Sequence, residues 1–211
     1  MSKYGILFDA DKCIACQACF VACKEENQVD PGMQWVRIER REDPKARIIT
    51  YFRASCQHCD EPACLKVCPA KAISKGRFGE VAVDQSKCIG CKACLAACPY
   101  GAPQFNDAKK TSYFGGKAPL AVRELEPWQK HVPGKAEHCT LCPQRLGEGR
   151  LPACVENCST GALTLIDYDA LKPEEAALLQ RAQMMTAKAG TQPKVRYLSS
   201  HVNFAEMSIK R

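Results

Sequence analysis

The sequence predicts an α+β protein built from two related units with short hairpins and short helices. Two observations carry this prediction: the spacing of the cysteines and an internal duplication. Of the 211 residues, 16 are cysteines, whereas aromatic residues make up only 7%. The conventional hydrophobic core is therefore thin. We expect bound metal to supply much of the folding free energy, because such sites do not exist in the unfolded chain.

The cysteines fall into four groups of four. Groups one and three have the spacing C-x2-C-x2-C-x3-C, group two has C-x2-C-x4-C-x3-C, and group four has C-x2-C-x11-C-x3-C. In order, the groups are Cys13, Cys16, Cys19 and Cys23; Cys56, Cys59, Cys64 and Cys68; Cys88, Cys91, Cys94 and Cys98; and Cys139, Cys142, Cys154 and Cys158. This spacing is typical of iron–sulfur ligands, in which a loop supplies three thiolates and the fourth cysteine binds the other cluster of a pair. Sixteen thiolates match four [4Fe–4S] clusters with none left over.

Two other interpretations of the cysteines are less favoured. A disulfide scaffold is usually a shorter, secreted chain, and residues 1–11 contain no apolar segment of the kind found in signal peptides. Structural zinc uses C-x2-C pairs, but it does not require C-x2-C-x2-C twice. His58 and His138 lie beside cysteines. Because the thiolate count is already complete, we expect His58 to be a loop residue that forms a hydrogen bond near a cluster.

The duplication relates groups one and three. Asp9–Cys23 and Asp84–Cys98 align without gaps, and nine of the 15 positions are identical. Groups two and four also share a final C-x3-C pair that is followed by a short turn of small residues. Such self-similarity indicates two related units, each with two clusters.

The expected elements follow the cysteine groups. Strands are predicted at 4–8, 162–168 and 195–198, and a helix that carries Cys23 at 18–26. The runs 35–40 and 47–52 flank turn-forming residues at 42–45 and predict a hairpin. Residues 76–79, followed by 81–83, predict a second one.

The rest of the chain is predicted to be more peripheral. Residues 107–137 form a long interval rich in glycine and proline, and we expect it to lie over the surface and to contact another subunit. Pro173 to Lys188 predicts a helix with Pro at its first turn, Glu174 and Glu175 at its positive end and Lys188 at its negative end. The polar tail that follows residue 198 is expected to reach outward.

The charge balance also favours clusters. The net charge is +7, and four oxidised clusters with four thiolates each would contribute about −8. The lysines beside ligands are expected to act as counter-charge or as ordinary surface groups, and they are Lys12, Lys24, Lys66, Lys87 and Lys92. Nucleic-acid binding is not expected, because the sequence has no basic stripe interleaved with aromatic residues. No apolar stretch approaches the ~20 residues that span a bilayer, and no enzyme motif is visible.

The order of motifs resembles the four-cluster iron–sulfur (beta) subunits of the molybdenum/tungsten-bis-pterin oxidoreductases, of the dimethyl sulfoxide, polysulfide and thiosulfate reductase type. The matching segments cover most of residues 5–165, and they are CIACQACFVACKEEN, CQHCDEPACLKVCPAKAI, CIGCKACLAACPYGAPQFN and CTLCPQRLGEGRLPACVENCSTGAL. Two features depart from the pattern: Ser159 rather than proline follows Cys158, and the interval between Cys98 and Cys139 is long.

The resemblance implies a nested pairing of ligands, which spacing alone does not choose over a sequential one. The four implied sets are Cys13, Cys16 and Cys19 with Cys158; Cys139, Cys142 and Cys154 with Cys23; Cys56, Cys59 and Cys64 with Cys98; and Cys88, Cys91 and Cys94 with Cys68. The last of these often lies nearest the membrane subunit in such families. Some relatives lose its second cysteine and bind a three-iron cluster there, but this chain retains Cys91, so we expect four irons.

The implied organisation is two pseudo-symmetric, bacterial-ferredoxin-like units. Residues 1–50 and 139–170 would form the first and residues 51–106 the second, with an inserted loop at 107–138 and a C-terminal helical extension at 171–211. The implied function is electron transfer between a large molybdenum or tungsten pterin catalytic subunit and a quinone-linked membrane subunit. The protein would then be a non-catalytic subunit, membrane-associated through its partners. The alternatives are a soluble polyferredoxin, the electron wire of another enzyme such as a tungsten aldehyde oxidoreductase, and a non-redox cluster or zinc protein.

Overall fold

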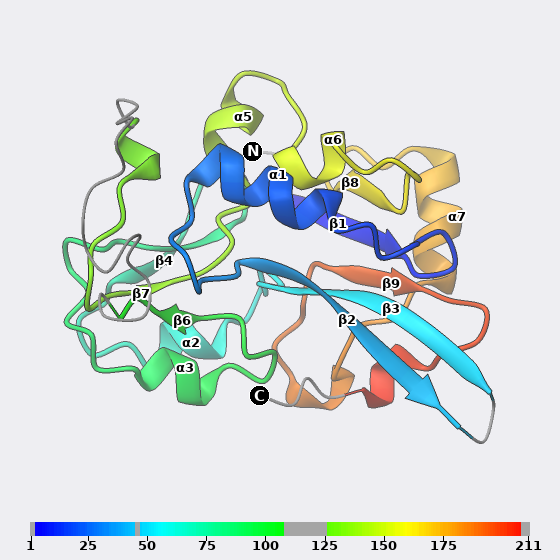
Figure 1. Cartoon of the computed structure of the whole chain (residues 1–211), viewed down its shortest axis with the longest axis horizontal. Coiled ribbons are helices and arrows are strands. Elements are labelled where there is room, and N and C mark those ends of the chain that lie inside the picture. Colours follow the sequence, from blue (N-terminus) through cyan, green and yellow to red (C-terminus); the bar gives the residue numbers. More distant parts are fainter. Residues whose placement is uncertain (1–2, 45–46, 108–125, 208–211) are drawn as a thin grey trace.

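The computed structural model describes residues 3–44, 47–107 and 126–207. Its strands are β1 (Tyr4–Asp9), β2 (Val36–Asp43), β3 (Ile48–Ser55), β4 (Ile73–Lys75), β5 (Val81–Val83), β6 (Gln104–Phe105), β7 (Ala136–Glu137), β8 (Leu163–Asp167) and β9 (Arg196–Leu198). Its helices are α1 (Ala18–Asn27), α2 (Ala63–Lys66), α3 (Ala93–Ala97), α5 (Pro143–Gly147), α6 (Ala153–Glu156) and α7 (Pro173–Arg181). Short antiparallel strand pairs are separated by short helices along the chain (Figure 1), as expected for an α+β protein. No helix among the described residues is long and apolar enough to cross a bilayer.

A three-stranded sheet joins the two ends of the chain. Its order is β8-β1-β9, with β1 antiparallel to β8 and parallel to β9. Leu7 lies opposite both Thr164 and Arg196, and the N–H of Asp9 donates to the carbonyl of Ala162 at 2.8 Å. The loop of group one follows β1 and group four precedes β8. The sheet therefore brings the first and last cysteine groups together, and the three predicted strands that form it are confirmed.

The hairpin β2–β3 is a long antiparallel ribbon that extends away from the rest of the molecule (Figure 1). Val36 pairs with Ser55 at its base, and Asp43 pairs with Ile48 near its turn. The base is buried, and it leads directly into group two. The predicted hairpin is confirmed, with longer strands than expected.

A smaller hairpin and a two-stranded sheet frame the remaining groups. In the β4–β5 hairpin Ile73 pairs with Val83, and the N–H of Gly76 donates to the carbonyl of Glu80 at 2.8 Å, which confirms the second predicted hairpin. Strand β6 follows group three and pairs antiparallel with β7, which precedes group four. Between β6 and β7, residues 108–125 lie outside the described residues.

The helices that carry cysteines pack in pairs. Helix α1 contacts α6, and α2 contacts α3. In three of the cysteine groups, the residue just before a helix has a left-handed backbone conformation. These residues are Gln17 before α1 (φ 64°), Lys92 before α3 (φ 62°) and Cys142 before α5 (φ 53°). Such turns point successive backbone N–H groups into one concavity, which suits an anionic ligand.

The C-terminal helix is shorter than predicted. It begins at Pro173 with Glu174 and Glu175 in its first turn, as expected, but it ends at Arg181 rather than at Lys188. The reason is a competing backbone interaction. Gln183 exchanges two hydrogen bonds with Tyr197 of β9, at 2.8 and 2.9 Å, and these extend the chain.

The expectation that the C-terminal tail reaches outward is wrong for its described part. Phe204 is fully buried. Its ring stacks on Tyr197 with centroids 4.9 Å apart, and it meets Phe52 edge-on at 6.2 Å. Burying a phenylalanine stabilises by about 1.5–3 kcal/mol, so this ring helps to dock an otherwise polar tail. Hydrogen bonds also hold the tail: the N–H of Phe204 donates to Gln183 Oε1 at 2.6 Å, and Thr186 Oγ1 donates to the Met207 carbonyl at 2.7 Å.

Candidate metal centres

Sixteen free thiols gather into four sets in the structure. We name these sets site A (Cys13, Cys16, Cys19 and Cys158), site B (Cys23, Cys139, Cys142 and Cys154), site C (Cys56, Cys59, Cys64 and Cys98) and site D (Cys68, Cys88, Cys91 and Cys94). Sites B, C and D each line one cavity, and none of these three cavities mixes thiols of two sets. Three thiols of each site come from one cysteine group and the fourth from another.

The three cavities are alike in size. The space free of protein atoms is ≈ 280 Å³ at site B and ≈ 330 Å³ at each of sites C and D. Within the described ranges, no three His, Cys, Asp or Glu side chains converge closely enough to bind a single metal ion. The thiols surround a volume instead, which fits a bulky inorganic cluster whose irons face outward.

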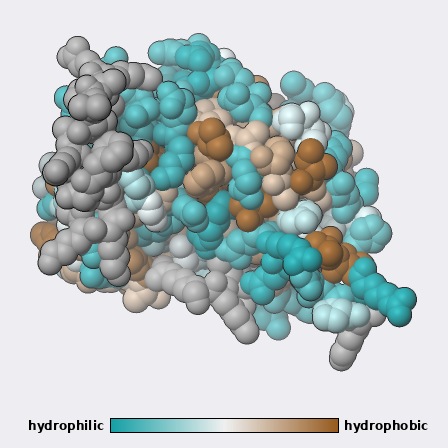
Figure 2. Space-filling model, viewed as in Figure 1, coloured by the Kyte–Doolittle hydropathy of each residue, from teal (hydrophilic) through white to brown (hydrophobic). Residues whose placement is uncertain are grey.

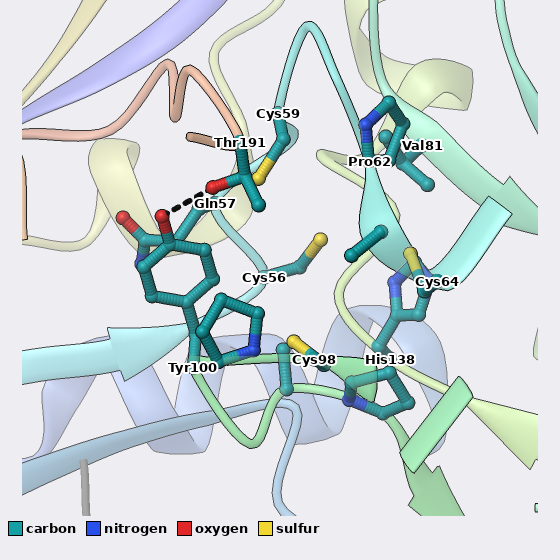
Figure 3. Close-up of a pocket in the computed structure, with 14 residues that line it drawn as sticks. Cys56, Gln57, Cys59, Pro62, Cys64, Val81, Cys98, Tyr100, His138 and Thr191 are labelled. Carbon is teal, nitrogen blue, oxygen red and sulfur yellow. Dashed lines mark hydrogen bonds between the residues drawn. The ribbon is translucent and has the colours of Figure 1, made fainter. Parts of the chain in front are cut away.

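Site C is the most apolar of these cavities. Figure 3 shows its four thiols around a space that Pro62 and Val81 line on one side and Tyr100 on the other. The Tyr100 hydroxyl lies 2.6 Å from Thr191 Oγ1, so the polar tip of this ring is satisfied. Such a lining excludes water from the thiols.

Site A lies at the surface. Its Cys16 is exposed, and the Cys16 sulfur lies 3.6 Å from the Ser159 hydroxyl. Burial raises the pKa of Cys13, and the neighbouring Cys158 and Cys16 add to this effect. Cys158 and Ser159 of group four therefore lie against the loop of group one.

Burial dominates the acidity of the enclosed thiols. It raises the pKa of Cys142 and Cys64 to about 12 and that of Cys59 to about 11, and neighbouring cysteines contribute. Without metal these thiols retain their protons, because a buried thiolate lacks a counter-charge. Iron supplies that charge, so metal binding would release the protons.

The sites follow one another in space, because thiols of adjacent sites affect each other. Burial raises the pKa of Cys19 in site A to about 11, and Cys154 of site B adds to it. Burial likewise raises the pKa of Cys56 in site C, with a contribution from Cys139 of site B. Burial also raises the pKa of Cys64, with a smaller contribution from Cys94 of site D. The spatial order is A, B, C, D.

Backbone and side-chain donors point at several sulfurs. The N–H of His58 donates to Cys56 Sγ at 3.4 Å, and that of Ala72 donates to Cys68 Sγ at 3.3 Å. Asn27 Nδ2 lies 3.7 Å from Cys23 Sγ and 4.0 Å from the sulfur of Cys142, both in site B. Donors of this kind stabilise negative charge on the sulfurs.

The two histidines behave as supporting residues. His58 Nδ1 accepts the N–H of Val81 at 3.1 Å, which confirms a hydrogen-bonding loop residue. His138 Nδ1 lies 2.8 Å from the Cys139 carbonyl. Burial lowers the pKa of both rings, so both are neutral.

The positive charge nearest the buried thiols comes from an arginine and not from the lysines beside the ligands. Three of the five lysines are exposed and pair with carboxylates, in the ion pairs Lys12–Asp9, Lys66–Glu61 and Lys87–Asp84. For these three, the interpretation as surface groups holds. The buried cation beside the thiols is Arg53, whose Nη2 lies 3.9 Å from Cys139 Sγ and 3.8 Å from Cys154 Sγ. The only sequence signal for it is a charged residue amid the apolar end of β3, just past the predicted strand.

Comparisons with known proteins agree with this geometry. Two family models, each described as a 4Fe-4S dicluster domain, match the chain: one at residues 48–113 and the other at 12–72 and 87–162. The B subunit of the anaerobic dimethyl sulfoxide reductase of Escherichia coli K12 is 33% identical over 196 residues, which cover 88% of this chain and 84% of the relative. The arsenate respiratory reductase iron–sulfur subunit of a Shewanella species is 32% identical over 94% of this chain and 97% of its own length. The thiosulfate reductase electron transfer subunit of Salmonella typhi is 39% identical over 77% and 74%, respectively.

The chain belongs to the iron–sulfur subunits of the dimethyl sulfoxide reductase type. It is an electron-transfer subunit with four [4Fe–4S] clusters. In such a subunit, cysteine thiolates hold the clusters. The residues around each cluster set its local charge and its exposure to water.

Proposed function

We propose that sites A, B, C and D each bind one [4Fe–4S] cluster through their four thiolates. The single observation that carries this ligand assignment is the set of three separate cavities, each lined by four cysteines of one site. The contacts of site A support the same nested pattern. When bound, each cluster accepts or donates one electron.

The two-unit organisation is also proposed. Residues 1–50 and 139–170 form one bacterial-ferredoxin-like unit, and residues 51–106 form its pseudo-symmetric counterpart. Two contacts support this division: α1 packs on α6 within the first unit, and α2 packs on α3 within the second. Residues 107–138 and 171–211 are then an insertion and an extension.

The subunit relays electrons between two partners at its opposite ends. We assign the catalytic molybdenum or tungsten pterin subunit to site A and a quinone-linked membrane subunit to site D. The group-one loop before α1 and the group-three loop before α3 lie at opposite ends of the molecule (Figure 1). Each has one exposed cysteine, Cys16 or Cys91, and one isoleucine that is 66% exposed, Ile14 or Ile89. An apolar side chain beside an exposed ligand suits a protein contact through which an electron passes.

The insertion provides a second contact with the catalytic partner. Its described part lies on the C-terminal end of α1, where Gln129 Nε2 donates to the Glu26 carbonyl at 2.9 Å. Trp128 beside it is 43% exposed. Figure 2 shows further hydrophobic surface over α1 amid a mostly hydrophilic face, and Val21 of α1 is 59% exposed.

Anaerobic purification with native mass spectrometry tests the assignment. We expect about sixteen irons per chain and co-purification with a large pterin-containing chain. A chain that binds its clusters but purifies alone would support the soluble polyferredoxin instead, and zinc without sulfide would exclude electron transfer. Protease protection on intact cells would then report the membrane face of the complex.

Charged substitutions test the two ends separately. Ile14→Asp should weaken binding of the catalytic subunit, and Ile89→Asp that of the membrane subunit, each at least tenfold, which corresponds to about 1.4 kcal/mol. Leu171→Asp is the matched control, because Leu171 is 41% exposed and belongs to neither loop. Equal binding by all three variants would contradict the proposed docking ends.

A further inference from the structure

Arg53 is a buried cation whose anionic partner is not a carboxylate. The residue is 0% exposed, near the end of strand β3 before group two. Its Nη1 donates to the Ser55 hydroxyl, and its carbonyl accepts from the Tyr197 hydroxyl at 2.9 Å. Nothing in the described part of the chain forms a carboxylate ion pair with it. A buried charge of this kind is costly unless it is paired.

The negative groups that face Arg53 are sulfurs. Its Nη2 contacts Cys139 and Cys154, two thiols of site B, at 3.9 and 3.8 Å. Although burial lowers the pKa of Arg53, the negative charge that Cys154, Cys139, Tyr197 and, more weakly, Cys19 can carry raises it above its usual value. The guanidinium therefore interacts most with site B and to a smaller extent with site A.

We propose that Arg53 raises the midpoint potential of the site B cluster, as the counter-charge of its reduced state. This inference rests on the ligand assignment proposed above. Reduction adds one electron and therefore one negative charge to the cluster. A fixed positive charge in a buried environment stabilises that added charge more than it stabilises the oxidised form. No proton is needed, because arginine remains protonated throughout.

No such cation lines the neighbouring cavity, that of site C. The residues that line site C include neither lysine nor arginine, and its one histidine, His138, is held neutral by burial. Figure 3 shows mainly apolar side chains and hydroxyl groups around those thiols. Site B has a second donor, Asn27, whose amide lies 3.7 Å from Cys23 Sγ. Two donors, from β3 and α1, therefore converge on one site.

The test is a redox titration followed by electron paramagnetic resonance, on the full chain prepared anaerobically with its clusters. In Arg53→Gln, one centre should become at least tenfold harder to reduce, a downward shift of about 59 mV for one electron. Asn27→Leu should lower the midpoint potential of the same centre by a smaller amount. The site A centre should shift slightly in the same direction in Arg53→Gln, and the other two should not shift. Arg40→Gln is the control, because it removes an exposed arginine from the same hairpin.

Arg53→Lys keeps the proposal testable if the glutamine variant loses the cluster. Lysine retains the positive charge of arginine. The site B potential should therefore stay close to the wild-type value in this variant. Equal potentials in the wild type and Arg53→Gln, a uniform shift of all four centres, or a fall of tenfold or more in Arg53→Lys would overturn the inference. Fewer than four reducible centres in the wild type would instead contradict the proposed ligand assignment itself.

Discussion

The nested arrangement of thiols can be tested by comparing which centre each cysteine variant removes. Cys98 lies in group three by sequence, but its thiol lines the site C cavity with three thiols of group two. We expect Cys98→Ala to remove the same centre as Cys59→Ala. It should leave intact the centre that Cys88→Ala removes. The reason is that Cys88 lines the separate cavity of site D.

The number of irons lost follows from the number of thiols in each cavity. Each cavity has four thiols, so loss of one leaves three ligands for a cluster that binds four. Iron should fall from about sixteen per chain to about twelve if the cluster is lost, or to about fifteen if a three-iron cluster remains. Site C is enclosed and apolar, and a missing thiolate there has no water to replace it. We therefore expect complete loss at Cys98 and a three-iron product at the exposed Cys91 of site D.

Anaerobic iron and sulfide determination, with resonance spectra recorded at fixed potentials, measures both quantities. The double variant Cys98→Ala with Cys59→Ala supplies the control, because it should lose no more iron than either single variant. If Cys98→Ala and Cys88→Ala remove the same centre, or if the double variant loses about eight irons, the nested arrangement is refuted.

Three further outcomes are expected. Phe204→Ala should destabilise the chain by about 3–5 kcal/mol and increase hydrogen exchange at residues 199–207, because its buried ring docks the tail; unchanged exchange would mean that the tail is held otherwise. Arg145→Ala should lower the free energy of unfolding by about 3 kcal/mol, because it breaks the ion pair of 2.8 Å that joins α5 to Glu26 of α1. Thermal unfolding at one scan rate measures this loss, with Arg150→Ala as the control. Burial lowers the pKa of His131, but the hydrogen bond that its ring donates to the Glu137 carboxylate at 2.8 Å raises this pKa above 6.5. The stability from this pair is therefore present below pH 6.5 and lost as pH rises through the folded pKa, and His131→Gln should flatten that part of the profile.

Local sequence patterns predicted most of the regular structure. The strands at β1, β8 and β9 and the two hairpins lie where alternation and turn residues indicated. The failures came where a distant segment intervened. Pairing of Gln183 with Tyr197 ended α7 early, and the aromatic contact of Phe204 turned a polar tail inward. Gln183 and Tyr197 belong to separate elements, and Phe204 also packs against the distant Phe52, so neither effect is visible in a local pattern.

The sequence by itself determined the number of thiols, their grouping along the chain and the kind of metal group that they suit, because three thiols of each site belong to one cysteine group. Only the tertiary structure decided which fourth thiol completes each cavity and which cation lies beside it. The sheet β8-β1-β9 joins group four to group one, and the base of the β2–β3 hairpin brings Arg53 against Cys139 and Cys154, far along the chain. These contacts arise when separate elements bury their surfaces together, and the spacing of residues along one segment does not encode them.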